Sequence, residues 1–340
     1  MTGSPTAASS STHLPWWRRI LASNTLWIFG VLIAISAVFA ILNPAAFATP
    51  FEVRSVATNA SMLLVVSVGM TFVIVTGGID LSVGSVLVFS GVVAARVMGA
   101  GTDEGPTADW PRILLGIAAG IIAGLIWGLI NGALVAYAKV PPLIATLGTL
   151  GAAYGLSLIN ANGQDLRGIP GKFTSTIGLG TVGGIPWLII IGALVTAAGA
   201  LVLSQTRFGR YTTAVGSNPE AARRVGINVR THLLKVYALQ GALAGLAGVL
   251  SLAYFTTTTI TGQTSLNLAA ITAVVIGGTS LFGGRGSVLG SAVGVFIPSV
   301  LASGLIIVGV QSYWQNVALG VVLVLAVFID QLRRQSRSRA

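Results

Sequence analysis

The chain has 340 residues, of which 54% are hydrophobic and only 8% are charged, and its formal net charge is +11. This balance excludes a soluble domain, because too few polar side chains are present to cover so large an apolar interior. It also argues against a nucleic-acid-binding domain, since the basic residues lie between apolar runs and at the two ends instead of on one soluble region.

Apolar segments long enough to cross a bilayer recur along the chain. Residues 1–25 precede them and are expected to form a cytoplasmic tail, in which Trp16-Trp17-Arg18-Arg19 is typical of a membrane-interface anchor. A spanning helix needs about 20 mostly apolar residues. By that measure ten segments run near Leu26–Ile41, Ser55–Thr76, Ser82–Met98, Ile113–Ala138, Leu143–Asn160, Trp187–Ser204, Leu233–Phe255, Leu268–Leu281, Ser287–Ser303 and Tyr313–Ile329. The sequence therefore predicts an all-α, polytopic integral membrane protein with about ten transmembrane helices.

The predicted organisation is one transmembrane domain over 26–332, with a cytoplasmic loop at 205–232 and a basic cytoplasmic tail at 333–340. The eighth segment is short, and a Gly-rich stretch follows it. We expect some helices to be broken or re-entrant here, which lipid tolerates only where protein or a water cavity meets the backbone.

The basic residues predict the orientation of these segments. With a cytoplasmic start, the inside collects Arg18, Arg19, Lys139, Arg207, Arg210, Arg223, Arg224, Arg230, Lys235, Arg285, Arg333, Arg334, Arg337 and Arg339, and the outside keeps Arg54, Arg96, Arg112, Arg167 and Lys172. An excess of Lys and Arg marks the cytoplasmic side. Both termini are therefore expected to be cytoplasmic, as an even number of crossings requires.

Glycine recurs every fourth residue at Gly116, Gly120, Gly124 and Gly128, which places the four on one helix face. Such a face permits close helix packing. Packing within the bundle is the favoured interpretation, and a seam between two copies of the chain is the alternative.

The first segment that breaks the apolar pattern is Val75-Thr-Gly-Gly-Ile-Asp-Leu-Ser-Val-Gly-Ser-Val86. Asp80 is the only acid close to a membrane-embedded path, and an ionisable group there is a functional hypothesis by default. Asp80 and Ser82 are also suitable caps for the helix that follows. Substrate contact or gating, with Gly77 and Gly78 beside the acid, and helix capping are both retained as interpretations.

The second segment, Val275-Ile-Gly-Gly-Thr-Ser-Leu-Phe-Gly-Gly-Arg-Gly-Ser-Val288, echoes the first, with Gly277, Gly278, Thr279 and Ser280 as its candidate pathway residues. Such echoes are typical of internal repeats and discontinuous helices in transporters. The predicted topology places both segments on the cytoplasmic side, which does not fit a strict inverted repeat of five plus five helices. The glycines permit a positive φ and close backbone approach in either case.

The third segment lies in the 205–232 loop and has the features of a short surface helix. Asn218 is a suitable cap, Pro219 suits the first helical position, Glu220 favours the positive end of the dipole, and Gly226 ends the helix. Docking on a soluble partner and an ordinary basic loop are equally compatible with these features. The residues of the helix proposed for docking are Asn218, Pro219, Glu220, Ala221, Ala222, Arg223 and Gly226.

Three stretches together resemble the hallmark motifs of the ribose/xylose-type permeases of bacterial ABC importers. They are Gly77-Gly-Ile-Asp-Leu-Ser-Val-Gly84, Gly216-Ser-Asn-Pro-Glu-Ala-Ala-Arg-Arg-Val-Gly-Ile-Asn228 and Ala273-Val-Val-Ile-Gly-Gly-Thr-Ser-Leu-Phe-Gly-Gly-Arg-Gly286. Their order is that of the family, and the similarity runs from about Leu26 to Arg334. The resemblance implies a sugar importer of the inner membrane, for a pentose such as ribose or xylose or a similar sugar.

The same resemblance implies the partners. They are a second permease copy or a paralogue, an ABC ATPase subunit and an extracytoplasmic sugar-binding protein, with the helix at Pro219–Val225 as the coupling helix. One departure concerns the substrate: family members often carry Tyr-Glu-Leu-Asp-Ala where this chain has Leu266-Asn-Leu-Ala-Ala270. Thr256–Thr259, Gln263 and Asn267 supply neutral hydrogen-bonding groups near the expected external mouth, which suit sugar hydroxyls.

Two rival functions are an ion-coupled secondary transporter and an intramembrane enzyme. The first usually needs titratable groups at mid-membrane, and apart from Asp80 the predicted spans offer none. The second lacks support because the chain has no cysteine, no His-Glu-x-x-His pair and no Ser-Lys pair within the spans. We expect no catalytic residue, metal or cofactor in this chain. Since it also lacks a Gly-x-x-x-x-Gly-Lys-Ser/Thr phosphate loop, ATP would be bound by the partner subunit.

Overall fold

The computed structural model describes residues 24–102, 105–262, 266–311 and 313–338. Most of them are helical. The principal helices are α2 (Asn24–Leu42), α4 (Pro50–Val75), α5 (Val83–Met98), α6 (Trp110–Ala136), α7 (Pro142–Asn160), α9 (Trp187–Gln205), α10 (Arg207–Ser217), α11 (Pro219–Arg224), α12 (Val229–Phe255), α13 (Leu266–Ile276), α14 (Val288–Ile307) and α15 (Tyr313–Ser338). Short elements fill the connections: α3 (Pro44–Phe47), η1 (Gly105–Thr107), α8 (Gly171–Phe173), η2 (Thr174–Gly178), and the antiparallel pair β1 (Thr181–Val182) and β2 (Ile185–Pro186).

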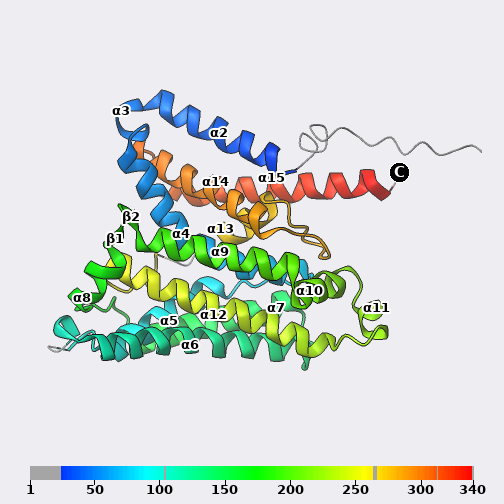
Figure 1. The fold of residues 1–340 in the computed structure, drawn as a ribbon, viewed down its shortest axis with the longest axis horizontal. Helices are drawn as coiled ribbons and strands as arrows, with labels where there is room; N and C mark the ends of the chain where they lie inside the picture. Colours follow the sequence, from blue (N-terminus) through cyan, green and yellow to red (C-terminus); the bar gives the residue numbers. More distant parts are fainter. Residues whose placement is uncertain (1–23, 103–104, 263–265, 312, 339–340) are drawn as a thin grey trace, which may run out of the picture.

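The helices cross the molecule along its long axis (Figure 1). Six of them, α4, α6, α7, α9, α12 and α14, are long and apolar enough to cross a membrane by length and composition. Shorter apolar stretches occur in α2, α5, α13 and α15. These helices coincide with the ten predicted segments, so the all-α membrane fold is confirmed.

The two ends of the bundle carry different connections. In Figure 1, α3, α8 and the β1–β2 hairpin lie at one end, while α10, α11 and the last turns of α15 lie at the other. We call these the hairpin end and the α11 end. Described basic residues gather at the α11 end: Lys139, Arg207, Arg210, Arg223, Arg224, Arg230 and Lys235. The tail expected from residue 333 begins inside α15, and Arg18 and Arg19 lie outside the described residues.

Helices α4 and α12 form the centre of the bundle. In their most apolar stretches, 89% of α4 residues and 78% of α12 residues are buried, against 28% for α7 and α9. Peripheral helices expose one face instead, as α6 does at Leu114 and Leu115. A helix that is apolar all round and covered by its neighbours is what the core of a membrane bundle requires.

The glycine stripe of α6 packs within the chain. A Cβ on Gly124 would overlap the Gly241 carbonyl of α12, and one on Gly128 would lie 2.9 Å from the Gly241 Cα. Gly120 faces α5 and α12 in the same way, at Ser90 and Val249. The stripe is therefore filled by this chain's own helices, as the favoured interpretation predicted, and the alternative of an intermolecular seam along it is wrong.

Candidate functional site

The first candidate segment forms a break between α4 and α5. Helix α4 ends at Val75, and the chain continues without helix until Val83. Asp80 lies in the middle of this break and is only 2% exposed. One oxygen of its carboxylate accepts both the Ser82 backbone N–H, at 2.8 Å, and the Ser82 hydroxyl, at 2.6 Å. Among the described residues no basic side chain forms an ion pair with Asp80.

This geometry corrects the capping prediction for Ser82. Ser82 occupies the N-cap of α5 but adopts helical backbone angles, φ −78° and ψ −14°, and its hydroxyl caps no N–H of the helix. A capping side chain normally needs an extended backbone at that residue. The Ser82 hydroxyl is directed to Asp80 instead, so the two residues form a local turn of the Asx type.

A buried polar network extends from this turn into α6 and α7. Asn131 Nδ2 donates to the Ser82 hydroxyl at 2.8 Å, and the Thr149 hydroxyl donates to Asn131 Oδ1 at 2.6 Å. The Thr146 hydroxyl reaches the Ile79 carbonyl at 3.2 Å. These bonds connect three elements in the low-dielectric interior, where satisfied polar groups fix geometry strongly. The network holds the α4–α5 break in one place.

Asn267 belongs to the same framework. We expected it among free hydrogen-bonding groups near an external mouth, but it is buried and engaged at both ends of its amide. Nδ2 donates to the Leu81 carbonyl at 3.1 Å, and Oδ1 accepts the Leu268 N–H at 2.8 Å. The Asn267 amide is thus occupied by the chain's own backbone, because the broken backbone at Leu81 needs a donor that no helix supplies. Its place near an external mouth stays a prediction.

The second candidate segment is a matching break between α13 and α14. Helix α13 is 11 residues long and ends at Ile276, and helix resumes at Val288. This confirms the prediction of a short eighth segment followed by non-helical chain. Gly277 packs against the start of α14, where its Cβ would lie 2.5 Å from the Ser291 Cα. Gly278 follows with φ +89°, which turns the chain away from α13.

Hydroxyl groups tie this second break to α4. Thr279 is 1% exposed and lies 3.5 Å from the Ser291 hydroxyl, which accepts a 2.8 Å bond from Thr71 of α4. The Ser280 N–H donates to the Arg285 carbonyl at 3.0 Å, and its hydroxyl accepts the Phe282 N–H at 3.4 Å. Thr279 and Ser280 thus shape the loop and its contact with α4.

All three candidate segments meet at one point, which we call the glycine junction: Gly77, Gly216, Gly283 and Gly284. The Gly284 N–H donates to the Val75 carbonyl at 2.8 Å, which joins the second break to the first. A Cβ on Gly283 would lie 2.8 Å from the Gly216 carbonyl and 3.0 Å from the Gly77 nitrogen. Gly283 and Gly284 also have φ of +81° and +75°, so larger residues would be strained there in any case.

Gly216 brings the 205–232 loop into this junction. It lies near the end of α10, and a Cβ on it would overlap the Val75 carbonyl oxygen and lie 2.7 Å from the Gly284 nitrogen. Gly78 makes a separate close contact, since its Cβ would lie 2.6 Å from the Tyr237 hydroxyl of α12. The backbones of the two breaks and of α10 are therefore in direct contact, so displacement of one is felt by the other two.

The short helix α11 follows directly from this contact. Asn218 caps it through a 3.0 Å bond from the Ala221 N–H, Pro219 takes the first helical position, and Gly226 follows it with φ +87°. Glu220 pairs with Arg223 at 2.9 Å on the exposed face. Ala222 is turned inward and packs with Val215 and Val229. The predicted capped surface helix is confirmed, and Ala221, Glu220 and Arg223 form its outer face.

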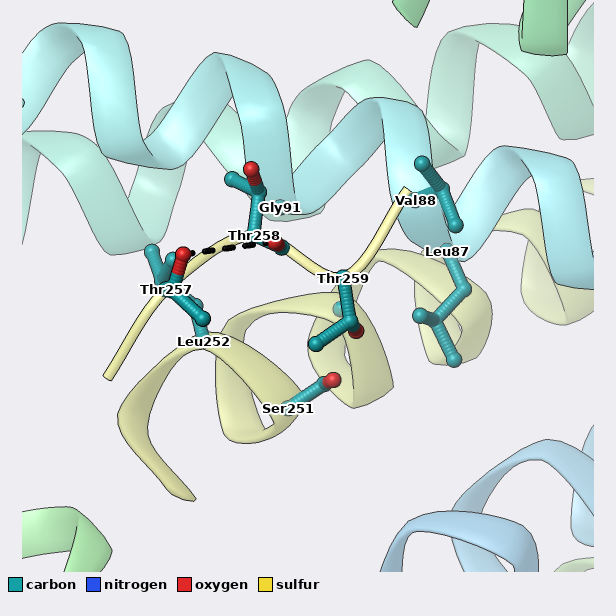
Figure 2. Close-up of a pocket in the computed structure, with 9 residues that line it drawn as sticks. Leu87, Val88, Gly91, Ser251, Leu252, Thr257, Thr258 and Thr259 are labelled. Atoms are coloured by element: carbon teal, nitrogen blue, oxygen red, sulfur yellow. Dashed lines mark hydrogen bonds between the residues drawn. The ribbon is translucent and has the colours of Figure 1, made fainter. Parts of the chain in front are cut away.

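The threonines after α12 do not surround a sugar-sized space. Figure 2 shows the pocket that Thr257, Thr258 and Thr259 form with α5 and α12, and its volume is only about 10 Å³. The Thr257 hydroxyl donates to the Leu166 carbonyl at 3.0 Å, and Thr258 Oγ1 accepts the Leu166 N–H at 2.7 Å. Such a volume holds one water at most. Thr257 and Thr258 therefore anchor residues 165–166, and the pocket is too small for a sugar.

Sequence reasoning missed several polar residues at the core of this site. Asn131, Thr146 and Thr149 were passed over because each is directly flanked by small or apolar residues and so stands out in no pattern. Tyr237 and Gln240 of α12 were missed for the same reason, although both are fully buried. The Tyr237 hydroxyl and both amide atoms of Gln240 have no hydrogen-bond partner among the described residues. Unsatisfied polar groups of this kind are uncommon in stable interiors and occur where a ligand, water or rearrangement completes them.

Asp80→Asn is expected to insert and fold normally but to lower transport roughly tenfold. Asparagine keeps an oxygen for the Ser82 N–H, so the turn survives, but the charge-assisted part of the bond is lost, and such bonds contribute about 1.5–3 kcal/mol. Asp80→Ala removes both bonds and should also lower thermal stability. The measurement is uptake alongside thermal unfolding in detergent. Unchanged uptake by Asp80→Asn would leave Asp80 with a purely structural role.

Comparison with known proteins agrees with this arrangement. The chain matches the family described as branched-chain amino acid transport system / permease component over residues 53–327. It is 39% identical over 307 residues to the ribose import permease protein RbsC of Bacillus subtilis (strain 168), covering 90% of this chain and 91% of that protein.

Two Escherichia coli (strain K12) proteins are similar over the same extent. The ribose import permease protein RbsC is 36% identical over 309 residues, covering 89% of this chain and 92% of the relative. The D-allose transport system permease protein AlsC is 33% identical over 304 residues, covering 89% and 90%. The three motifs, the paired helix breaks and the extent of these matches lead to one conclusion: the chain belongs to this permease family and is a multi-pass membrane transport subunit.

Proposed function

We propose that the chain is the permease subunit of an ATP-binding cassette importer of the bacterial inner membrane, and that it moves a monosaccharide. The sugar, a pentose such as ribose or xylose or one of similar size, is delivered by an extracytoplasmic binding protein. The observation that carries this proposal is the contact at the glycine junction between α10, which leads into the exposed helix α11, and the two helix breaks. It provides a short mechanical connection from a docking surface to the interior.

In this proposal the α11 end faces the cytoplasm. Its basic residues support that orientation, since Lys and Arg are enriched on the cytoplasmic side. In Figure 1 the start of α2 and the end of α15 are both directed toward the α11 end, which supports the proposal that the two termini are cytoplasmic. A separate ATPase subunit binds and hydrolyses ATP while contacting α11, and a second copy of the chain or a paralogue completes the pathway.

The substrate class is supported by the relatives and not by the family description. The description of the family mentions branched-chain amino acid transport. The three relatives reported above are instead named as permeases for ribose or allose. The α4–α5 break has a single acid whose described bonds stay within the chain, and no described basic side chain pairs with it. An amino acid would need partners for both its charged groups, whereas a sugar needs only neutral hydrogen-bonding groups.

The proposal is tested by uptake from a panel of substrates. The chain is reconstituted in liposomes with its ATPase and binding protein, and radiolabelled ribose, xylose, allose and leucine are offered separately. We expect at least one of the sugars to accumulate in an ATP-dependent manner and leucine to remain outside. Accumulation of leucine with no uptake of any sugar would contradict the assignment.

A further inference from the structure

A cavity of about 350 Å³ lies in the hairpin-end half of the bundle, between α4, α13, α14 and α15. Its polar lining residues are Asn59, Ser299, Ser303, Gln315 and Asn316. Asn59 lies nine residues after the start of α4, or about 14 Å along that helix at 1.5 Å per residue. The cavity therefore lies in the half of the bundle opposite to α11.

Its size suits a small molecule. Sites for small ligands commonly enclose about 300–1,000 Å³, and a single water needs only about 10–15 Å³. Pro298 contributes to the space, because it lies inside α14 and has no N–H to continue the helical hydrogen bonds. Phe255 and Met62 give the walls an apolar component. A mostly apolar wall with a few polar groups is the usual composition of a ligand site.

The polar groups have hydrogen-bonding capacity to spare. Gln315 Nε2 is buried and has no hydrogen-bond partner among the described residues. Asn59 Nδ2 donates to the Ser55 carbonyl at 3.0 Å, which leaves its Oδ1 as an acceptor. The Ser299 hydroxyl donates to the Val295 carbonyl at 2.9 Å and the Ser303 hydroxyl donates to Glu52, so both oxygens can still accept. A donor that is buried without a partner is costly unless a ligand or water completes it.

None of the described lining residues is charged. Glu52 does not line the cavity, and it accepts the hydrogen bond of the Ser303 hydroxyl. Burying an anion or a cation in such a space is unfavourable, because none of the described lining residues carries an opposite charge that would compensate its lost hydration. The hydroxyl groups of a ligand both donate and accept hydrogen bonds, so they match the amide and hydroxyl side chains that line the cavity. A lipid chain would leave Gln315 Nε2 unpaired and is disfavoured for that reason.

We infer that this cavity is a binding site for a neutral, polyhydroxylated solute the size of a monosaccharide. The solute binds there before it reaches the helix breaks. The inference rests on the proposed function and assigns it a substrate site within a single chain. Asn59 and Gln315 are its principal hydrogen-bonding residues.

The test combines Asn59→Leu with Gln315→Met, which keep side-chain size and remove hydrogen bonding. The matched control is Asn160→Leu with Gln311→Met, two amides at the same end of the bundle that do not line the cavity. Both proteins are reconstituted with the ATPase and binding protein, and ribose is the probe. We expect uptake at low ribose to fall at least tenfold in the cavity variant only, while ATP hydrolysis stimulated by the loaded binding protein stays at the wild-type rate.

A second variant tests the same site if the Asn59→Leu/Gln315→Met protein does not fold. Ala302→Phe fills the cavity from α14, and Ala193→Phe adds the same bulk to the exposed face of α9. Ala302→Phe should lower uptake at least tenfold and Ala193→Phe should not. Equal uptake by the cavity variants and their controls would overturn the site. If wild-type protein takes up no sugar in this assay, the proposed function fails, which is a distinct result.

Discussion

Ala221→Trp in α11 is expected to abolish ATP-driven uptake in the assembled importer. Ala221 is exposed on the outer face of the helix, so a bulky ring there does not disturb the packing of Ala222 with Val215 and Val229. The ring does, however, prevent this face of α11 from fitting into a groove on the ATPase subunit. Uptake should fall at least a hundredfold, which corresponds to about 2.8 kcal/mol, while insertion and thermal stability remain those of the wild type.

Glu220→Lys tests the same face by charge. The Glu220–Arg223 pair is exposed on both sides, so its loss should lower stability by no more than about 1 kcal/mol. Reversing the charge at the start of α11 should nevertheless prevent docking and abolish stimulated ATP hydrolysis. Ile33→Trp, on the exposed face of α2, is the control for added bulk. Wild-type uptake by both α11 variants would show that this helix does not couple the two subunits.

Gly216→Ala is expected to disrupt the glycine junction and so disconnect α10 from the helix breaks. The added methyl group would overlap the Val75 carbonyl, and neither backbone can move aside without shifting a helix end. Overpacking of this kind commonly costs about 1–3 kcal/mol. We expect a lower unfolding temperature, and ATP hydrolysis that continues at the basal rate without sugar uptake.

A matched substitution separates this effect from a general intolerance of alanine. Gly30 lies in α2 with nothing within 4 Å of the position that a Cβ would occupy. Gly30→Ala should be neutral or slightly stabilising, because alanine favours helix. If Gly216→Ala transported sugar as well as Gly30→Ala does, the junction would have no role in coupling.

The local features of this protein were predictable from its sequence. Apolar length defined the ten segments, and the residues Asn218, Pro219 and Gly226 defined α11, because caps and helix breakers act on their own neighbours. The α13–α14 break was predictable for the same reason, from Gly277 and Gly278. These features depend on a few consecutive residues.

The contacts between segments were not predictable in the same way. Glycines indicate that backbones can approach closely, but they do not identify the partner segment. The contact of Gly283 with Gly77 and Gly216 is therefore seen only in the structure. The capping role expected of Ser82 failed because the Asp80 carboxylate competed for its hydroxyl. Tyr237 carries no sequence signal, since a polar side chain between the apolar residues Val236 and Ala238 forms no pattern.

The proposed import mechanism is tested most directly by the energy source of uptake. Liposomes containing the purified chain, its ATPase subunit and its binding protein are loaded with ATP in the absence of any ion gradient, and ribose uptake is followed. Uptake is expected to require ATP and all three components. Uptake by the chain alone, driven by a proton or sodium gradient without ATP, would contradict it.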